Sequence, residues 1–111
     1  MTNSISQEVG RLIDQARQGD DSARQRLFTV GRDYMGLVAR AQVESWLRAK
    51  VDASDVVQQT MLEAHRDFTR FEGNSEKEWL GWLRRILSHN LADFVRQYRG
   101  TSKRAERLRA W

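Results

Sequence analysis

The sequence predicts an all-α protein, a compact bundle of about four helices that ends in a long basic helix. The 111 residues include no proline and only seven glycines, and Ala, Leu, Arg, Gln and Glu, which favour helices, are abundant. Apolar residues recur at spacings of three and four in separate segments of the chain. The length suits a single domain, and the 40% of hydrophobic residues can form one core.

Capping residues and glycines set the expected bounds of the helices, over about residues 6–18, 22–50, 54–70 and 75–99. Gly19 is typical of a helix C-terminus, and the polar residues after it can cap the next helix: Asp20, Asp21 or Ser22. Asp52 or Ser54 can cap the third helix, and Ser75 with Glu78 fits a capping box for the fourth. We therefore expect residues 1–100 to form one helical domain and residues 101–111 to form a basic tail or linker.

One apolar stripe of each predicted helix is expected to form the core. In chain order these stripes contain Ile5, Val9, Leu12, Ile13 and Ala16; Leu27, Phe28, Tyr34, Leu37, Val38, Ala41 and Trp46; Val57, Met61, Ala64, Phe68 and Phe71; and Leu80, Leu83, Leu87, Leu91, Phe94 and Tyr98. The two tryptophans at the start of the fourth helix widen its stripe. Core packing suits Trp82, one turn before Ile86, whereas Trp79, next to a polar loop, is the better candidate for partial exposure.

The net charge of +4 is unevenly distributed. Residues 1–75 carry ten Lys/Arg and eleven Asp/Glu, whereas residues 76–111 carry nine Lys/Arg and four Asp/Glu. The excess of positive charge at the C-terminal end indicates a polyanionic partner. A solvated basic surface without a partner is the alternative.

The third predicted helix has a second face that the core does not explain. This face carries Asp55, Gln58, Gln59, Leu62, Glu63 and Arg66. An apolar residue framed by amides and charges is expected at the centre of a small protein interface with a polar rim. An isolated exposed leucine, which needs no function, is the alternative for Leu62.

The fourth predicted helix has a basic second face, formed by Arg85, His89, Ala92, Arg96 and Arg99, with Arg84, Ser88 and Lys103 beside it. Guanidinium groups along one helix face suit phosphates, and Ser88, His89 and Asn90 can reach base edges or sugars. The neighbouring aromatics and polar loop favour single-strand binding by stacking and backbone charge. The alternative is the solvated face of a surface helix.

Catalysis, metal binding and membrane insertion are not expected. The chain has no cysteine, and His65 and His89 lie on different predicted helices without an HExxH motif, so we expect no metal and no cofactor. No glycine-rich phosphate loop and no paired nucleophile and base indicate an enzyme. No apolar run approaches the roughly 20 residues that span a bilayer, and no signal peptide is evident, so we expect a cytoplasmic protein.

The stretch "DASDVVQQTMLEAHRDFTRFEGNSEKEWLGWLRRILSHNLADFVRQYR" resembles the second conserved region of bacterial sigma factors, most closely the extracytoplasmic-function (group 4) class. The residues that carry the resemblance are Asp55, Val57, Gln58, Gln59, Leu62 and Ala64; Phe71 and Gly73; and Trp82, Leu83, Ile86 and Asn90. The resemblance covers about residues 25–100. The chain departs from the family pattern in three places: the segment from Phe71 to Trp82 is about two residues longer, Gln59 replaces a common acidic residue, and His89 and Asn90 compete for one Asn position.

The resemblance implies a sigma region 2-like fold and two partners, RNA polymerase core and promoter DNA. The helix face from Asp55 to Arg66 would dock on the clamp helices of the β′ subunit. The loop from Glu72 to Lys77 would hold a base flipped from the non-template strand of the −10 element, and the start of the last helix would contact flanking bases and phosphates. The DNA-binding residues implied in this way are Glu72, Gly73, Asn74, Ser75, Lys77, Trp79, Arg84, Arg85, Ser88, His89, Asn90, Arg96 and Arg99.

The resemblance also implies features that this sequence does not itself contain. No helix-turn-helix domain for the −35 element follows Trp111, so we expect a fragment of a longer factor, with residues 101–111 leading toward that domain. An anti-sigma factor is a further partner that the class implies. The alternatives to a sigma factor domain are a helical protein-interaction module and a generic nucleic-acid-binding domain unrelated to polymerase.

Overall fold

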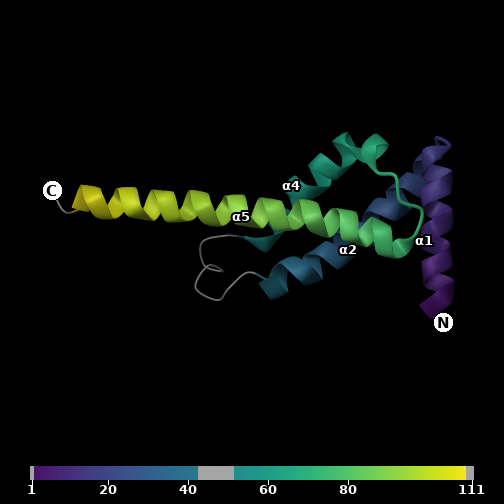
Figure 1. Cartoon of the computed structure of the whole chain (residues 1–111), viewed down its shortest axis with the longest axis horizontal. Helices are drawn as coiled ribbons and strands as arrows, with labels where there is room; N and C mark the ends of the chain where they lie inside the picture. Colours follow the sequence, from purple (N-terminus) through teal and green to yellow (C-terminus); the bar gives the residue numbers. More distant parts are fainter. Residues whose placement is uncertain (1, 43–51, 110–111) are drawn as a thin grey trace.

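The computed structural model describes residues 2–42 and 52–109, with side chains described at positions 5–42 and 52–97. Within these ranges the chain forms four α-helices, one 3-10 turn and no strand, so the expected all-α fold is confirmed. The elements are α1 (Thr2–Arg17), α2 (Asp21–Gln42), α4 (Ala53–Arg66), η1 (Phe68–Arg70) and α5 (Glu76–Arg109) (Figure 1). None of the described helices is both long and apolar enough to cross a membrane.

The long helix α5 organises the bundle. Its first half packs against α2 and α4, which also pack against each other, and α1 packs on α2 and on the N-terminal part of α5. Figure 1 shows α1 at one end of the bundle, running across the start of α5, while the second half of α5 projects away from the other helices. The other helices therefore pack against the half of α5 that follows the polar loop.

The α1–α2 turn has the local structure that the sequence predicts. Gly19 has a φ of 95°, a left-handed conformation in which a side chain is disfavoured. The Asp20 carboxylate then accepts a 3.1 Å hydrogen bond from the Ala23 backbone N–H, which caps α2. Of the three candidate caps, Asp20 makes this bond.

The N-termini of α4 and α5 are also capped by predicted residues. The Asp52 carboxylate accepts from the backbone N–H of Ser54 at 3.0 Å. The Ser75 hydroxyl oxygen accepts from the Glu78 N–H at 3.2 Å, and the Glu78 carboxylate accepts from the Asn74 N–H at 3.4 Å. These bonds fix where the polar loop between η1 and α5 joins the long helix.

The core lies where the four helices meet. The buried apolar residues are Val9, Leu12, Ile13, Ala16, Ala23, Leu27, Phe28, Met35, Ala39, Val56, Val57, Met61, Ala64, Phe68, Phe71, Trp79, Leu83 and Leu87. At Gly31 of α2 a Cβ atom would lie 2.5 Å from the Leu83 Cδ1, so the missing side chain lets α2 and α5 approach closely.

Three expectations about the apolar stripes are wrong. Ile5 is 60% exposed and Leu37 is 67% exposed, and Ala41 is also exposed. Ile5 lies near the start of α1, and Leu37 and Ala41 lie on a side of α2 other than the one that buries Met35 and Ala39. Trp46 and the expected continuation of the second helix to residue 50 lie outside the described residues.

The bounds of the last two helices differ from the expected ones. Helix α4 ends at Arg66, and η1 replaces its expected last turn. Helix α5 continues through Gly100 to Arg109, instead of ending near Arg99. A single glycine in a helix costs only about 1 kcal/mol, and the absence of proline leaves nothing that would stop the helix there.

Candidate protein and nucleic-acid interfaces

The outer face of α4 is exposed, as the sequence predicts. Helix α4 buries Val56, Val57, Thr60, Met61 and Ala64 on its inner side. The opposite side exposes Asp55, Gln58, Gln59, Leu62 and Arg66, with Glu63 partly buried at its edge. Leu62 is 59% exposed, one of three large hydrophobic side chains on the described surface with so much exposure. We call these six residues the α4 face.

A groove between α2 and α4 borders this face. Its lining includes Leu37 and Arg40 from α2 and Gln58, Met61 and Leu62 from α4. The exposed Leu37 therefore lies along the same groove as Leu62. Sequence reasoning missed the α2 side of this surface, because helical spacing shows which residues share a face but not which helices are neighbours.

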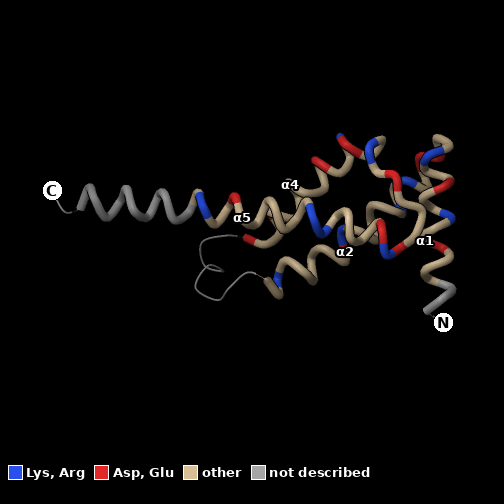
Figure 2. The backbone as a smooth tube through the Cα atoms, in the orientation of Figure 1, with Lys and Arg blue, Asp and Glu red and all other residues tan. Residues whose placement is uncertain are grey.

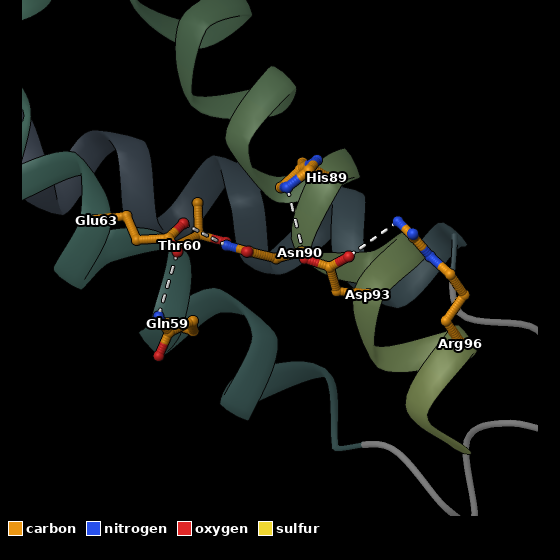
Figure 3. Close-up of polar contacts among 7 residues, drawn as sticks. All are labelled: Gln59, Thr60, Glu63, His89, Asn90, Asp93 and Arg96. Carbon is orange, nitrogen blue, oxygen red and sulfur yellow. Dashed lines mark hydrogen bonds and ion pairs between the residues drawn. The ribbon is translucent and has the colours of Figure 1, made fainter. Parts of the chain in front are cut away.

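A polar link joins the α4 face to α5 (Figure 3). The Asn90 side-chain amide donates to the Glu63 carboxylate at 2.8 Å and to the Thr60 hydroxyl oxygen at 3.0 Å. The other carboxylate oxygen of Glu63 accepts from the Gln59 amide at 3.3 Å, and the Thr60 hydroxyl donates to the Val56 carbonyl at 2.8 Å. Thr60 is fully buried.

Asn90, which the sequence predicts to reach a base edge, is buried against α4. Asn90 is 5% exposed, and the NH₂ group of its side chain has a partner for each hydrogen. The residue faces α4, where a buried amide without partners would be costly. Its function in this structure is to hold α5 against α4.

The exposed face of α5 carries cations with different surroundings. Arg84 and Arg85 are exposed and make no hydrogen bond or ion pair with any other described residue. Asp93, by contrast, lies 3.5 Å from His89 and 2.9 Å from Arg96, so it offsets charge further along the helix (Figure 3). Among the described side chains of α5, Arg84 and Arg85 are therefore more available to a phosphate than Arg96.

The surface charge of the described side chains is mixed. Figure 2 shows Lys and Arg interspersed with Asp and Glu over the bundle, without one large block of a single sign. Much of the C-terminal excess of positive charge lies in the part of α5 beyond residue 97, whose side chains are outside the described set. Arg99 is one of these residues: its backbone belongs to α5, and its side chain is not among those described.

The polar loop between η1 and α5 alternates buried and exposed residues. Phe71 and Gly73 are buried, whereas Glu72 and Asn74 are exposed. A Cβ atom on Gly73 would lie 2.6 Å from the Phe71 ring and 2.7 Å from the Glu78 Cβ, so only glycine fits this position. Gly73 therefore shapes the loop, and the exposed Glu72 and Asn74 are the side chains that a ligand could reach, together with Ser75 and Lys77 in the turn that follows.

The two tryptophans have exchanged the roles that the sequence predicts. Trp79 is fully buried, with ring centroids 5.2 Å from Phe28 and 5.3 Å from Phe71, and the expectation that it is partly exposed is wrong. Trp82 is the half-buried ring, 5.2 Å from Phe71 beside the loop. Trp79 can be buried because Gly31 has no side chain and so leaves room on α2 for the indole ring.

Buried in this way, the Trp79 indole N–H has no hydrogen-bond partner among the described residues. The indole ring packs against the surrounding aromatic rings, which supply a large apolar contact area. Trp79 is thus part of the core, and Trp82 is the aromatic side chain that remains accessible next to the loop.

The groups that could bind metal are dispersed. Among the described side chains, no three His, Asp or Glu residues are grouped as a metal ion would require. His65 instead stacks on Phe28, with ring centroids 3.7 Å apart and an interplanar angle of 10°. His65 is largely exposed, but partial desolvation of its ring, followed by the charges of the nearby Arg24 and Arg32, lowers its pKa below the ordinary value.

Helix α4 thus presents a face suited to a protein partner, and the following helix, α5, presents the exposed Arg84 and Arg85. The Sigma-70 region 2 family model matches residues 31–101, which include most of α2, all of α4, the loop and most of α5. The chain therefore belongs to the sigma-70 region 2 family, as its sequence resemblance indicates. No curated protein and no solved structure gives a significant match.

Membership of this family defines the broad function. Sigma factors are DNA-binding proteins of transcription initiation rather than enzymes, and region 2 takes part in binding RNA polymerase core and in promoter recognition. The match covers both the α4 face and the exposed face of α5. The group 4 assignment stays a prediction from the sequence.

Proposed function

We propose that this chain is the region of a group 4 sigma factor that docks on the β′ clamp helices of RNA polymerase and recognises and melts the promoter −10 element. The observation that carries the proposal is one pair of packed helices with two different exposed faces. Helix α4 presents Leu62 within a polar rim, and α5, which follows the loop, presents the exposed Arg84 and Arg85. Since Asn90 links the two helices, docking and DNA binding occur on one rigid unit.

Docking is assigned to the α4 face. Leu62 is the one apolar residue of that face, and burying its side chain in an interface would contribute about 1.5–3 kcal/mol. Arg66 is held by Asp67 through two hydrogen bonds of 3.0 Å, so its side chain is already ordered at the edge of the face. Asp55, Gln58 and Gln59 supply exposed polar groups for the rim.

DNA binding is assigned to the loop and to the exposed side of α5. The exposed side chains of the loop and of the turn after it would receive a base flipped out of the stack: Glu72, Asn74, Ser75 and Lys77. Arg84 and Arg85 would bind phosphates, with Ser88 and His89 beside flanking bases and Arg96 and Arg99 further along the strand. Trp82, half-buried next to the loop, adds a ring on which a base can stack.

In this proposal Gly73, Trp79 and Asn90 support the interface without contacting DNA. Residues 1–100 act as the domain that binds polymerase and promoter, and residues 101–111 act as a basic linker, in which α5 continues to Arg109. The protein acts in the cytoplasm, where it meets the polymerase, and an anti-sigma factor is a further proposed partner.

Binding of single-stranded DNA in the presence of core polymerase tests the proposal. A fluorescently labelled pool of randomised single strands is mixed with core polymerase, with the chain, or with both, and the bound strands are sequenced. The proposal predicts a sequence-specific subset that is retained only when both proteins are present. Retention of the same strands by core polymerase with and without the chain would contradict it.

A further inference from the structure

One face of helix α1 runs along the polar loop, although α1 lies outside the residues that match the family model. Ser6, Gly10 and Arg17 are spaced by four and seven residues, so they share one side of the helix. The Ser6 hydroxyl donates to the Glu76 carboxylate at 3.4 Å. A Cβ atom on Gly10 would lie 3.4 Å from the Asn74 carbonyl oxygen, which shows how closely the helix approaches the loop.

Arg17, at the end of this face, makes the strongest contacts with the loop. Its guanidinium donates to the carbonyl oxygen of Phe71 at 2.9 Å and also to the carbonyl oxygen of Gly73. The same group lies 5.2 Å from the centroid of the Phe71 ring. One side chain therefore holds two loop carbonyls and the ring between α1 and the loop.

These contacts matter because the backbone of residues 71–74 makes few other hydrogen bonds with the described residues. The Phe71 N–H is bonded back to η1 at 3.1 Å and the Asn74 N–H to Glu78 at 3.4 Å, which fixes the two ends of the segment. In between, the carbonyls of Phe71 and Gly73 converge on Arg17. A guanidinium is always charged and presents its donors in a planar fork, so it can hold two acceptors at once.

We infer that Arg17 is a positioning residue that fixes the backbone of loop 71–75 in the shape that receives an unstacked DNA base. The inference rests on the proposed function of the loop. Arg17 acts through the loop and touches no DNA itself. Because a pre-ordered loop loses less conformational freedom when it binds, removing Arg17 weakens capture of the base without weakening the remaining DNA contacts.

The test compares two strands that differ at one position. The first step takes a strand that the wild-type chain and core polymerase retain together. A set of variants of this strand is prepared, each with an abasic site in place of one nucleotide. The replacement that weakens binding most identifies the captured base. Affinities for the intact and abasic strands are then measured by fluorescence anisotropy with the wild-type chain, Arg17→Ala and Arg17→Lys. Arg11→Ala is the matched control, since Arg11 is also an exposed arginine of α1 and has no partner among the described residues.

Arg17→Ala is expected to bind the intact strand roughly tenfold more weakly, as loss of charge-assisted hydrogen bonds implies, and to bind the abasic strand like the wild type. Arg17→Lys keeps the charge but not the planar fork. Its affinity for the intact strand is expected to lie between those of the wild type and Arg17→Ala. Arg11→Ala is expected to bind both strands like the wild type. In hydrogen exchange, the amides of residues 72–75 are expected to lose protection in Arg17→Ala while those of α4 keep theirs.

Two results would overturn the inference while leaving the proposed function intact. In the first, Arg17→Ala binds both strands with wild-type affinity. In the second, its affinity for the intact strand and its affinity for the abasic strand fall by the same factor. If Arg17→Ala does not fold, Arg17→Lys decides by the same comparison. A wild-type chain that tolerates an abasic site at every position would refute base capture itself, and the inference with it.

Discussion

The side-chain amide of Asn90 on α5 donates a 2.8 Å hydrogen bond to the carboxylate of Glu63 on α4. Glu63 belongs to the α4 face, and Asn90 follows directly after His89, which lies on the exposed side of α5. The bond therefore connects the surface proposed to meet the polymerase with the helix proposed to meet DNA. Fixed geometry between two contact surfaces is what a protein needs when it must place DNA relative to a second partner.

Asn90→Ala is expected to lower the free energy of unfolding by about 1–3 kcal/mol, because Thr60 and Glu63 both lose their donor in or near the core. Urea denaturation measures this change. Ser88→Ala, on the exposed side of the same helix, is the control and should change stability by less than about 0.5 kcal/mol. An Asn90→Ala variant as stable as the control would show that the link is not a structural one.

Gly73→Ala is expected to destabilise the protein by about 1–3 kcal/mol, since the added methyl group would clash with the Phe71 ring and the Glu78 Cβ. Gly81→Ala is the matched control: nothing lies within 4 Å of a Cβ there, and the position is inside α5. That change should stabilise the helix by about 0.5–1 kcal/mol. Thermal unfolding of the two variants should shift in opposite directions, and equal shifts would contradict the loop geometry.

His65 is expected to make the protein less stable as the pH falls from 7.5 to 5.5. Partial desolvation of its ring, followed by the charges of Arg24 and Arg32, lowers its pKa in the folded state below the ordinary value of about 6.5. The unfolded chain then takes up the proton first, so the free energy of unfolding decreases as the pH falls through the unfolded pKa and levels off below the folded one.

Urea denaturation across this pH range measures the slope. His65→Phe, which can keep the stacking on Phe28 but cannot titrate, should reduce the slope. An unchanged slope in a folded His65→Phe variant would contradict the assignment to His65.

Arg85→Ala is expected to weaken DNA binding by a similar factor on every sequence and to reduce the slope of log affinity against log salt by about 1, as removal of one phosphate contact should. Arg96→Ala should have a smaller effect, because Asp93, 2.9 Å away, already offsets its charge. The measurement is a salt titration of binding to single strands with core polymerase present. Arg26→Ala, on α2, is the control; a loss confined to some sequences would mean that Arg85 reads bases.

Helical periodicity was sufficient to predict the inner and outer sides of α4. The inner residues Val57 and Met61 and the outer residue Leu62 follow directly from the repeat of a helix, and the structure places all three on the expected sides. The caps at Asp20 and Ser75 could be predicted for a similar reason, since a cap depends on bonds to residues two or three positions away. Properties that depend on neighbours in the chain could thus be predicted from the sequence.

Properties that depend on contacts between helices could not be predicted in the same way. Trp79 and Trp82 lie only about 60° apart around α5, and the space beside Gly31 of α2 decides which of them is buried. Asn90 has the residue type of a base-reading side chain, and only the packing of α5 on α4 shows that it bonds to Thr60 and Glu63. The contact of Arg17 with the loop spans more than fifty residues of sequence, and no local pattern indicates it.

The most direct test of the central claim is an isothermal calorimetric titration of the chain against an isolated β′ clamp-helix fragment. It uses the native chain, Leu62→Asp, and Ile5→Asp as the matched control. Ile5, at 60% exposure, resembles Leu62, at 59%, but lies on α1 away from the α4 face. Circular dichroism establishes first that all three chains are folded.

The account predicts saturable binding by the native chain and by Ile5→Asp, and no measurable binding by Leu62→Asp, because a carboxylate would be buried without a partner at the centre of the interface. Equal affinity of Leu62→Asp and the native chain, or no binding by any of the three folded chains, would contradict it.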